Sequence, residues 1–158
     1  ELTGIVLDAL ALSGQRGVIA TGWGGLTEGD LPGTVFAVRD VPHSWIFPRV
    51  SAVVHHGGAG TTIAGLRAGC PTVVCPFFAD QPFWGRRIHA LGAGPRPIPQ
   101  RRLTAPRLAD AITSAVHDVN MRVIAGLLKQ QLADESRLDR TVALIESLSG
   151  RRLRAAER

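Results

Sequence analysis

Residues 51–76, with the sequence SAVVHHGGAGTTIAGLRAGCPTVVCP, decide the fold of this chain. The apolar runs at 52–55 and 72–74 are short and continuous, which is typical of strands buried on both faces of a parallel sheet. Between them, a glycine-rich turn at 57–60 leads into a helical stretch at 63–68 that ends at a glycine. This order of strand, turn, helix and strand predicts a doubly wound, Rossmann-like α/β fold.

The same alternation of strand and helix continues on both sides of this unit. Glycines punctuate it, with Gly14 after the first helical pattern and glycine-rich breaks at 22–25 and 92–95. The further expected elements are a helix at 2–12, strands at 18–21 and 34–38, a helical turn at 44–47, a helix at 81–91 and an extended segment at 96–98.

The last third of the chain has only helical patterns. Thr104 and Asn120 are candidate N-caps for two helices, and Ser136 with Asp139 resembles a capping box before a third. We therefore expect a sheet-containing domain over 1–118, helices over 119–150 that pack on it, and a basic, disordered tail over 151–158. Because Glu1 runs straight into a helical pattern without an initiator Met, we also expect sequence upstream.

The composition is that of an ordinary globular domain, with 158 residues, 45% of them hydrophobic and 20% charged. No window reaches the roughly 18 uninterrupted apolar residues of a membrane span. Cys70 and Cys75 lack the spacing of a zinc site, so we expect small buried side chains in a reduced, cytoplasmic protein.

The formal charge of +5 is unevenly distributed along the chain. Basic residues without an intervening acid follow Asp80, namely Arg86, Arg87, Arg96, Arg101, Arg102 and Arg107. One interpretation is solvated faces and a frayed basic tail; the other is weak peripheral contact with an anionic membrane surface. The sequence has no Tyr and few other aromatic residues, so we do not expect nucleic-acid binding.

The glycine-rich turn is a candidate phosphate-binding site. In doubly wound proteins, glycines between a strand and a helix let an anion approach the first N–H groups of the helix. The turn at 57–60 has this position, and Thr61 and Thr62 follow it with hydroxyl groups. A tight connection without a ligand is the alternative, because the P-loop Lys and the GxGxxG spacing are both absent.

Polar side chains flank this turn. His56 could donate to a phosphate oxygen, whereas His55 would point to the other face of the strand. These neighbours diverge and no third ligand is suitably spaced, so we expect no metal site. Asp80 and Gln81 follow the next strand, where a carboxylate and an amide could bind vicinal sugar hydroxyls. Asp80 could equally cap the helix that follows.

Taken together, the segments at 40–43, 51–62 and 76–85 resemble the donor-binding signature of the UDP-glycosyltransferase family. The segments at 21–25 and 77–85 are most similar to its sterol 3-β-glucosyltransferase branch. The resemblance covers residue 2 to about residue 112. It implies a GT-B architecture, in which two Rossmann-like domains enclose the active site. This chain would be the C-terminal, UDP-sugar-binding domain, with its first strand missing.

The resemblance also implies roles for individual residues. Val41 and His43 would lie in the segment that holds the uracil, and His56 would contact the donor diphosphate. Asp80 and Gln81 would bind the hydroxyls of the transferred sugar. The residues implied for the phosphate site are Gly58, Gly60, Thr61 and Thr62.

The sequence departs from the plant members at two positions. Asp40 stands where they have a uracil-stacking Trp, and Ala64 stands where they have a ribose-binding Glu. Trp23 or Trp45 could supply a stacking surface instead, and packing alone is the alternative for each.

The implied activity is inverting transfer of a hexose from UDP-glucose or a similar UDP-sugar to a hydroxyl of a sterol or other lipophilic acceptor. No cofactor or metal is implied. The catalytic base would belong to the missing N-terminal domain, so no catalytic residue is assigned here and the chain alone should be inactive. The alternatives are a non-catalytic UDP-sugar-binding module and a UDP-sugar epimerase, for which Asp80 alone is thin support.

Overall fold

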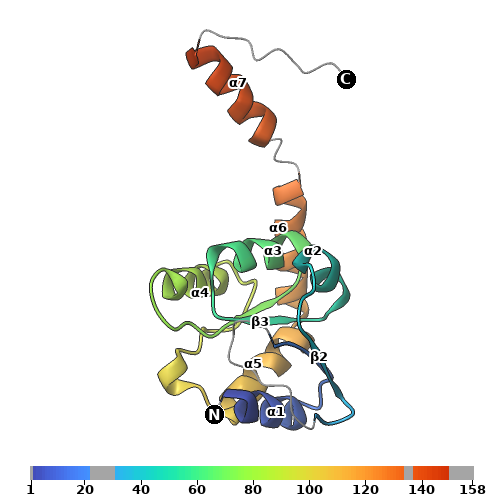
Figure 1. Cartoon of the computed structure of the whole chain (residues 1–158). Coiled ribbons are helices and arrows are strands. Elements are labelled where there is room, and N and C mark those ends of the chain that lie inside the picture. Colours follow the sequence, from blue (N-terminus) through green and yellow to red (C-terminus); the bar gives the residue numbers. More distant parts are fainter. Residues whose placement is uncertain (1, 22–30, 134–136, 150–158) are drawn as a thin grey trace.

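A computed structural model describes residues 2–21, 31–133 and 137–149 (Figure 1). It confirms the α/β class and the parallel direction of the strands. Trp23, the glycine-rich break at 22–25, Ser136 and the tail at 151–158 lie outside the described residues. The elements are, in chain order, α1 (Leu2–Ser13), β1 (Gly17–Ala20), β2 (Val35–Val38), α2 (His43–Ile46), η1 (Phe47–Arg49), β3 (Val53–His55), α3 (Ala59–Ala68), β4 (Thr72–Val74), α4 (Gln81–Ala90), η2 (Gln100–Arg102), α5 (Ala105–His117), α6 (Val119–Ala133) and α7 (Arg137–Ser149).

The four strands form two separate parallel pairs among the described residues, where the sequence predicts one continuous sheet. β1 pairs with β2, with Gly17 opposite Val35, and β3 pairs with β4, with Val53 opposite Thr72. The segment predicted to be extended at 96–98 adds a hydrogen bond at the far edge of β4, from Ile98 N to Val74 O at 3.0 Å.

Helices cover both faces of the strand pairs, as in a doubly wound fold. α1 packs along α5 on one face, where Ala9, Leu10, Ile19 and Leu108 are buried in one apolar cluster. α3, α4 and α6 surround a second cluster on the other face, whose members include Val74. Figure 1 shows α1 and α5 on one side of β3, and α3 and α4 on the other.

Most of the helix ends that glycines predicted are found in the structure. Gly14 and Gly69 have φ angles of 65° and 73° and follow α1 and α3. Thr104 is the N-cap residue of α5, as expected. The assignment of Asn120 as a cap is wrong, because the Asp118 carboxylate accepts hydrogen bonds from the backbone N–H groups of Asn120 and Met121 at 2.8 and 3.2 Å.

The helices after residue 118 differ in their surroundings. α6 packs across α3, and Ile124 and Leu128 contact the second apolar cluster. α7 extends away from the other elements in Figure 1, and Leu144 and Ile145 on it are exposed. Within the described residues, no helix has the length and apolarity to cross a membrane.

Both cysteines are free and buried, as expected for small core side chains. Burial raises the pKa of the Cys70 thiol to about 11 and that of Cys75 to about 12, so both remain protonated at neutral pH.

Candidate functional site: the β3–α3 turn and its cavity

The turn between β3 and α3 requires glycine at its first position. Gly57 has a φ of 94°, a left-handed conformation that strains other residues. A Cβ atom at Gly57 would lie 2.7 Å from Val74 Cγ1 and 3.1 Å from the Gln81 carbonyl oxygen. The turn is therefore held against β4 and the start of α4. Gly58 follows as the N-cap residue of α3.

The first turn of α3 presents backbone N–H groups that have no partner within the helix. In an α-helix the first N–H groups precede the first intrahelical acceptors, and here they belong to Ala59, Gly60 and Thr61. Together with the helix dipole they form an electropositive end that favours an anion.

The structure places Thr62 differently from the sequence-based assignment to the phosphate site. Its side chain is fully buried, and both its backbone N–H and its hydroxyl donate to the Gly58 carbonyl at 2.9 Å. Thr62 therefore closes the first turn of α3, and neither of its donors is directed outward.

His55, at the end of β3, has a buried ring nitrogen beside the turn. The backbone N–H of Gly57 donates to His55 Nδ1 at 2.9 Å, so the neutral ring carries its hydrogen on Nε2. This buried Nε2 has no hydrogen-bond partner among the described residues. Burial, and then the proximity of His56 and His43, lowers the pKa of His55 to about 4, so the ring is neutral at physiological pH.

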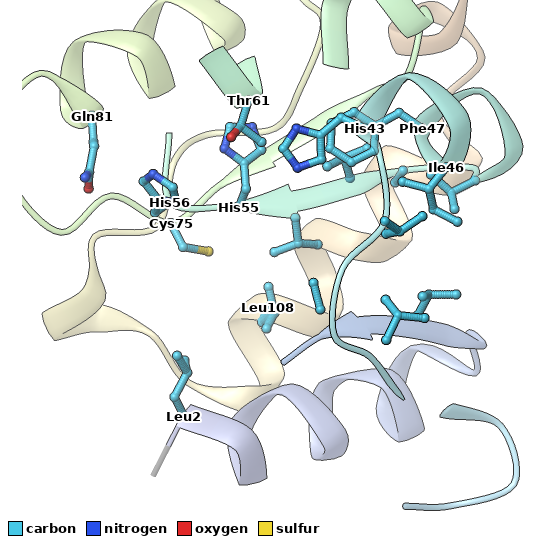
Figure 2. Close-up of a pocket in the computed structure, with 18 of the residues that line it drawn as sticks. Leu2, His43, Ile46, Phe47, His55, His56, Thr61, Cys75, Gln81 and Leu108 are labelled. Carbon is cyan, nitrogen blue, oxygen red and sulfur yellow. The ribbon is translucent and has the colours of Figure 1, made fainter. Parts of the chain in front are cut away.

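A cavity of about 740 Å³ lies at the carboxyl ends of β1, β2 and β3. It brings together five of the sequence-predicted site residues, namely Val41, His43, His56, Thr61 and Gln81, and adds Asp40 and His55. Figure 2 shows His43, His55 and Thr61 near one another, with His56 and Gln81 along the same edge. Gly58, Gly60, Thr62 and Asp80 do not line it.

Asp80 and Gln81 stabilise the loop before α4. Gln81 is buried, and its Oε1 accepts hydrogen bonds from the backbone N–H groups of Phe77 and Phe78 at 2.8 and 3.2 Å. Its side-chain NH₂ group takes no part in these bonds. Asp80 is exposed at the N-cap position of α4, and its Oδ2 accepts a hydrogen bond from Trp84 Nε1 at 2.8 Å rather than from the helix backbone.

The stacking surface proposed for Trp45 is not directed into this cavity. Trp45 is 54% exposed, is absent from the cavity lining, and carries the Arg49 guanidinium 4.5 Å from its ring centre. His43 stacks on Phe47 instead, with ring centres 4.5 Å apart. Ala64 packs in the apolar cluster around Phe47.

Sequence reasoning missed His55, because strict alternation along a strand assigns it to the face opposite His56. The residue lies where β3 ends, and its hydrogen bond with Gly57 turns the ring toward the cavity. The available signal was a pair of histidines, His55 and His56, before a glycine-rich turn. The described residues contain no group of three His, Cys, Asp or Glu side chains that could hold a metal ion.

Comparison with solved structures defines the class. The chain has the fold of the C-terminal part of a GT-B glycosyltransferase, and it superposes on the glycotransferase of kitacinnamycin with a TM-score of 0.77 and 26% sequence identity. This match covers 91% of the present chain and 38% of that protein.

Comparison of the amino-acid sequence with known proteins identifies the family. Residues 12–146 match the erythromycin biosynthesis protein CIII-like C-terminal domain, and the chain belongs to this family. It is 49% identical over 136 residues to a sterol 3-beta-glucosyltransferase of Arabidopsis thaliana, covering 85% of this chain and 21% of that protein. It is also 44% identical over 119 residues to O-mycaminosyltylonolide 6-deoxyallosyltransferase of Streptomyces fradiae, covering 75% and 28%. The chain thus spans between a fifth and a third of these curated relatives.

Proposed function

We propose that the cavity at the β3–α3 turn binds a UDP-sugar, UDP-glucose or a close analogue, as the donor for hexose transfer to a hydroxyl of a sterol or other lipophilic acceptor. The observation that carries the proposal is that Thr61, in the first turn of α3, and His55, at the end of β3, line the same cavity at the carboxyl ends of the strands.

Neutral hydrogen-bond donors at these positions suit the leaving group of a glycosyl transfer. The acceptor oxygen bonds to the anomeric carbon while the bond from that carbon to the diphosphate oxygen breaks, and the electron pair leaves with UDP. Negative charge therefore grows on the diphosphate. Donors preorganised around that charge lower the barrier by several kcal/mol. Of the predicted phosphate residues, Gly58, Gly60 and Thr61 remain in this proposal, with His56 on the cavity wall.

The sugar is assigned to Asp80 and Gln81 and the base to Val41 and His43. Gln81 lines the cavity, and the Trp84 hydrogen bond uses only one of the two Asp80 carboxylate oxygens. Val41 and His43, which follow β2, line the same cavity. The general base that accepts the acceptor proton is assigned to a part of the enzyme outside this chain.

Calorimetric titration with UDP-glucose, UDP and uridine tests this proposal. We expect UDP and UDP-glucose to bind and uridine to bind at least about tenfold more weakly, because the diphosphate supplies the contact with α3. Equal affinities for uridine and UDP would contradict a phosphate site at the turn. Transfer by the enzyme that contains this domain would distinguish a glycosyltransferase from a non-catalytic UDP-sugar-binding module.

Weak peripheral contact with anionic membranes belongs to the same proposal, since the acceptor is lipophilic. The exposed basic side chains that would supply it are Arg86, Arg87, Arg96, Arg101, Arg102 and Arg107. Sedimentation with vesicles that contain phosphatidylserine, compared with neutral vesicles, measures it.

A further inference from the structure

Asp40 places a negative charge in the wall of a cavity that is proposed to bind an anion. It lies two residues after β2, its side chain is exposed, and it lines the cavity of about 740 Å³. No other aspartate or glutamate among the described residues lines this cavity. A carboxylate that faced the diphosphate would weaken its binding by like-charge repulsion. Asp40 therefore needs a ligand group other than the phosphates.

The fold makes no use of the Asp40 carboxylate. Within the part of the chain that the structure describes, no group forms a hydrogen bond or an ion pair with it. The β1–β2 ladder ends before it, with the hydrogen bond from Thr21 N to Val38 O at 2.9 Å. The N-cap residue of α2 is Pro42, and no side chain caps that helix. Both carboxylate oxygens are therefore available to a ligand, and replacing Asp40 should not disturb the fold.

The side chains that line the cavity follow one another along the carboxyl ends of the strands. Asp40 follows β2, the glycine-rich turn follows β3, and Gln81 begins α4 after β4. In the view of Figure 2, His43 lies on one side of Thr61 and Gln81 on the other. A UDP-sugar is a linear molecule with the diphosphate in its middle, so its two ends extend in opposite directions from the start of α3. With the hexose assigned to Asp80 and Gln81, the nucleoside lies on the side of Asp40.

The nucleoside offers this carboxylate two kinds of neutral hydrogen-bond donor. Uracil has a single ring N–H group, whereas ribose has two adjacent hydroxyl groups, which can donate to both oxygens of one carboxylate. In dinucleotide-binding α/β folds, an acid near the same edge of the sheet accepts a hydrogen bond from the ribose 2′-hydroxyl. Val41 and His43 are assigned to the base, and the ribose lies between the base and the diphosphate. The ribose is therefore the better partner for an acid beside these residues.

We propose that Asp40 binds the ribose 2′- and 3′-hydroxyls of the donor and makes the site selective for ribonucleotides over 2′-deoxyribonucleotides. This inference rests on the proposed function and adds the residue that selects the nucleoside. Asp40 contacts the ribose at one end of the donor and Asp80 the hexose at the other, so the two carboxylates flank the diphosphate without touching it. Charge-assisted hydrogen bonds from the hydroxyls offset the repulsion between Asp40 and the phosphates.

The exposure of Asp40 sets the size of the expected effect. A site that binds a hydroxyl rejects the analogue without it, because a polar group of the protein then loses its partner. Water can reach the exposed Asp40 carboxylate and replaces the missing hydroxyl in part. We therefore expect a selectivity of about tenfold, below the factor for a fully buried group.

Calorimetric titration of the 158-residue chain with UDP, 2′-deoxy-UDP and inorganic pyrophosphate tests the inference. The wild type should bind UDP about tenfold more tightly than 2′-deoxy-UDP. Asp40→Ala should weaken UDP binding about tenfold and bring the two nucleotides to the same affinity within about twofold. Pyrophosphate has no ribose, so it should bind Asp40→Ala at least as tightly as the wild type, because one repelling charge is removed.

Two further variants separate the hydrogen bonds from the charge. Asp40→Asn loses the charge but keeps one acceptor oxygen, so it should retain a preference for UDP of about threefold. Asp8→Ala is the matched control, because Asp8 is an exposed acid on α1 that does not line the cavity. It should leave the affinities for all three ligands unchanged.

The outcomes distinguish this inference from the proposed function. Wild-type affinities for UDP and 2′-deoxy-UDP that agree within about twofold would overturn the role of Asp40 and leave the donor site intact. So would a preference for UDP that persists in full in Asp40→Ala. Weaker pyrophosphate binding by Asp40→Ala would also overturn it, because the residue would then support the phosphate site. A wild-type chain that fails to bind UDP would contradict the proposed function and, with it, the role of Asp40.

Discussion

His55 links the local backbone to the chemistry of the cavity. Its Nδ1 accepts the Gly57 N–H, and its Nε2 is left as a buried donor. The ring fulfils both roles only while it is neutral, because a protonated Nδ1 cannot accept a hydrogen bond. The fold therefore depends on pH through this residue.

We expect this dependence to appear as a loss of stability in mild acid. The pKa of His55 is lowered from 6.5 to about 4, so the unfolded chain takes up the proton first. The stabilisation is complete above pH 6.5 and is lost as the pH falls toward 4, up to about 3 kcal/mol. Urea unfolding of the wild type and His55→Gln between pH 5 and 7.5 measures it. The control is His117→Gln, because His117 is exposed. An unchanged pH slope in His55→Gln would contradict this account.

His56 should contribute to nucleotide affinity rather than to stability. It is exposed, lines the cavity, and directly precedes the turn. Replacement with Ala removes one donor to the diphosphate and should weaken UDP binding by about 1–3 kcal/mol. Calorimetry of His56→Ala beside His117→Ala gives the comparison. Unchanged UDP affinity in His56→Ala would show that this side chain does not contact the donor.

Asp80 should contribute to the affinity for UDP-glucose but not to the affinity for UDP. Asp80→Ala should weaken UDP-glucose binding by about 1–2 kcal/mol while UDP affinity stays nearly unchanged, since the carboxylate is assigned to the hexose. Asp80→Asn keeps an acceptor for Trp84 Nε1 and separates loss of the charge from loss of that hydrogen bond. Equal losses for both ligands would instead indicate that the start of α4 has rearranged.

At the scale of elements, the β3–α3–β4 unit was the most predictable part of the chain. Continuous apolar runs and a glycine-rich turn are local signals, and the structure has a strand, a turn and a helix there. α3 begins at Ala59, four residues before the expected stretch at 63–68, because Gly58 serves as its N-cap. Likewise, α6 begins at Val119, one residue before the expected cap Asn120, because the Asp118 carboxylate accepts a hydrogen bond from the backbone at its start.

The split of the strands into two pairs could not be predicted in this way. The sequence of an apolar strand indicates that both of its faces are buried, but it does not indicate which other strand pairs with it. The hydrogen-bond partners of Thr62 and Gln81 could not be predicted from the sequence for a related reason. Whether a hydroxyl or an amide faces a ligand or its own backbone depends on side-chain rotamers, and here both side chains bond to nearby backbone groups.

The glycine turn gives a matched pair of stability predictions. Gly57→Ala should destabilise the fold by about 2–4 kcal/mol, because it combines a strained φ with a Cβ atom close to Val74 Cγ1. Gly60→Ala should be neutral or stabilising by up to about 1 kcal/mol, since no atom lies within 4 Å of the new Cβ atom and Ala favours helix. Thermal or urea unfolding compares them, and equal effects would show that the turn is not constrained as described.

At the scale of the whole molecule, the chain has the fold of one part of a GT-B enzyme and spans 21% of the sterol 3-beta-glucosyltransferase it resembles. Its cavity opens at the carboxyl ends of the strands, where a second domain would close over a bound donor. Binding of the donor and transfer of the sugar should therefore be separable properties.

We expect the 158-residue chain to bind UDP but to show no glycosyl transfer. Loss of a general base alone typically costs about two to four orders of magnitude, and an open site also leaves water at the reacting carbon. Radiolabelled UDP-glucose with a sterol acceptor, assayed with this chain and with a form that carries the acceptor domain, measures the difference. Equal turnover by the two forms would contradict the assignment of the base to another domain.

The central claim is that the β3–α3 turn holds the donor diphosphate. Titration of ¹⁵N-labelled protein with UDP tests it most directly. The account predicts saturable shifts of the Ala59, Gly60 and Thr61 amides and of the His55 Nε2–H, with smaller effects from uridine. Saturation by UDP without any change at these four N–H groups, or with the largest changes elsewhere in the chain, would contradict it.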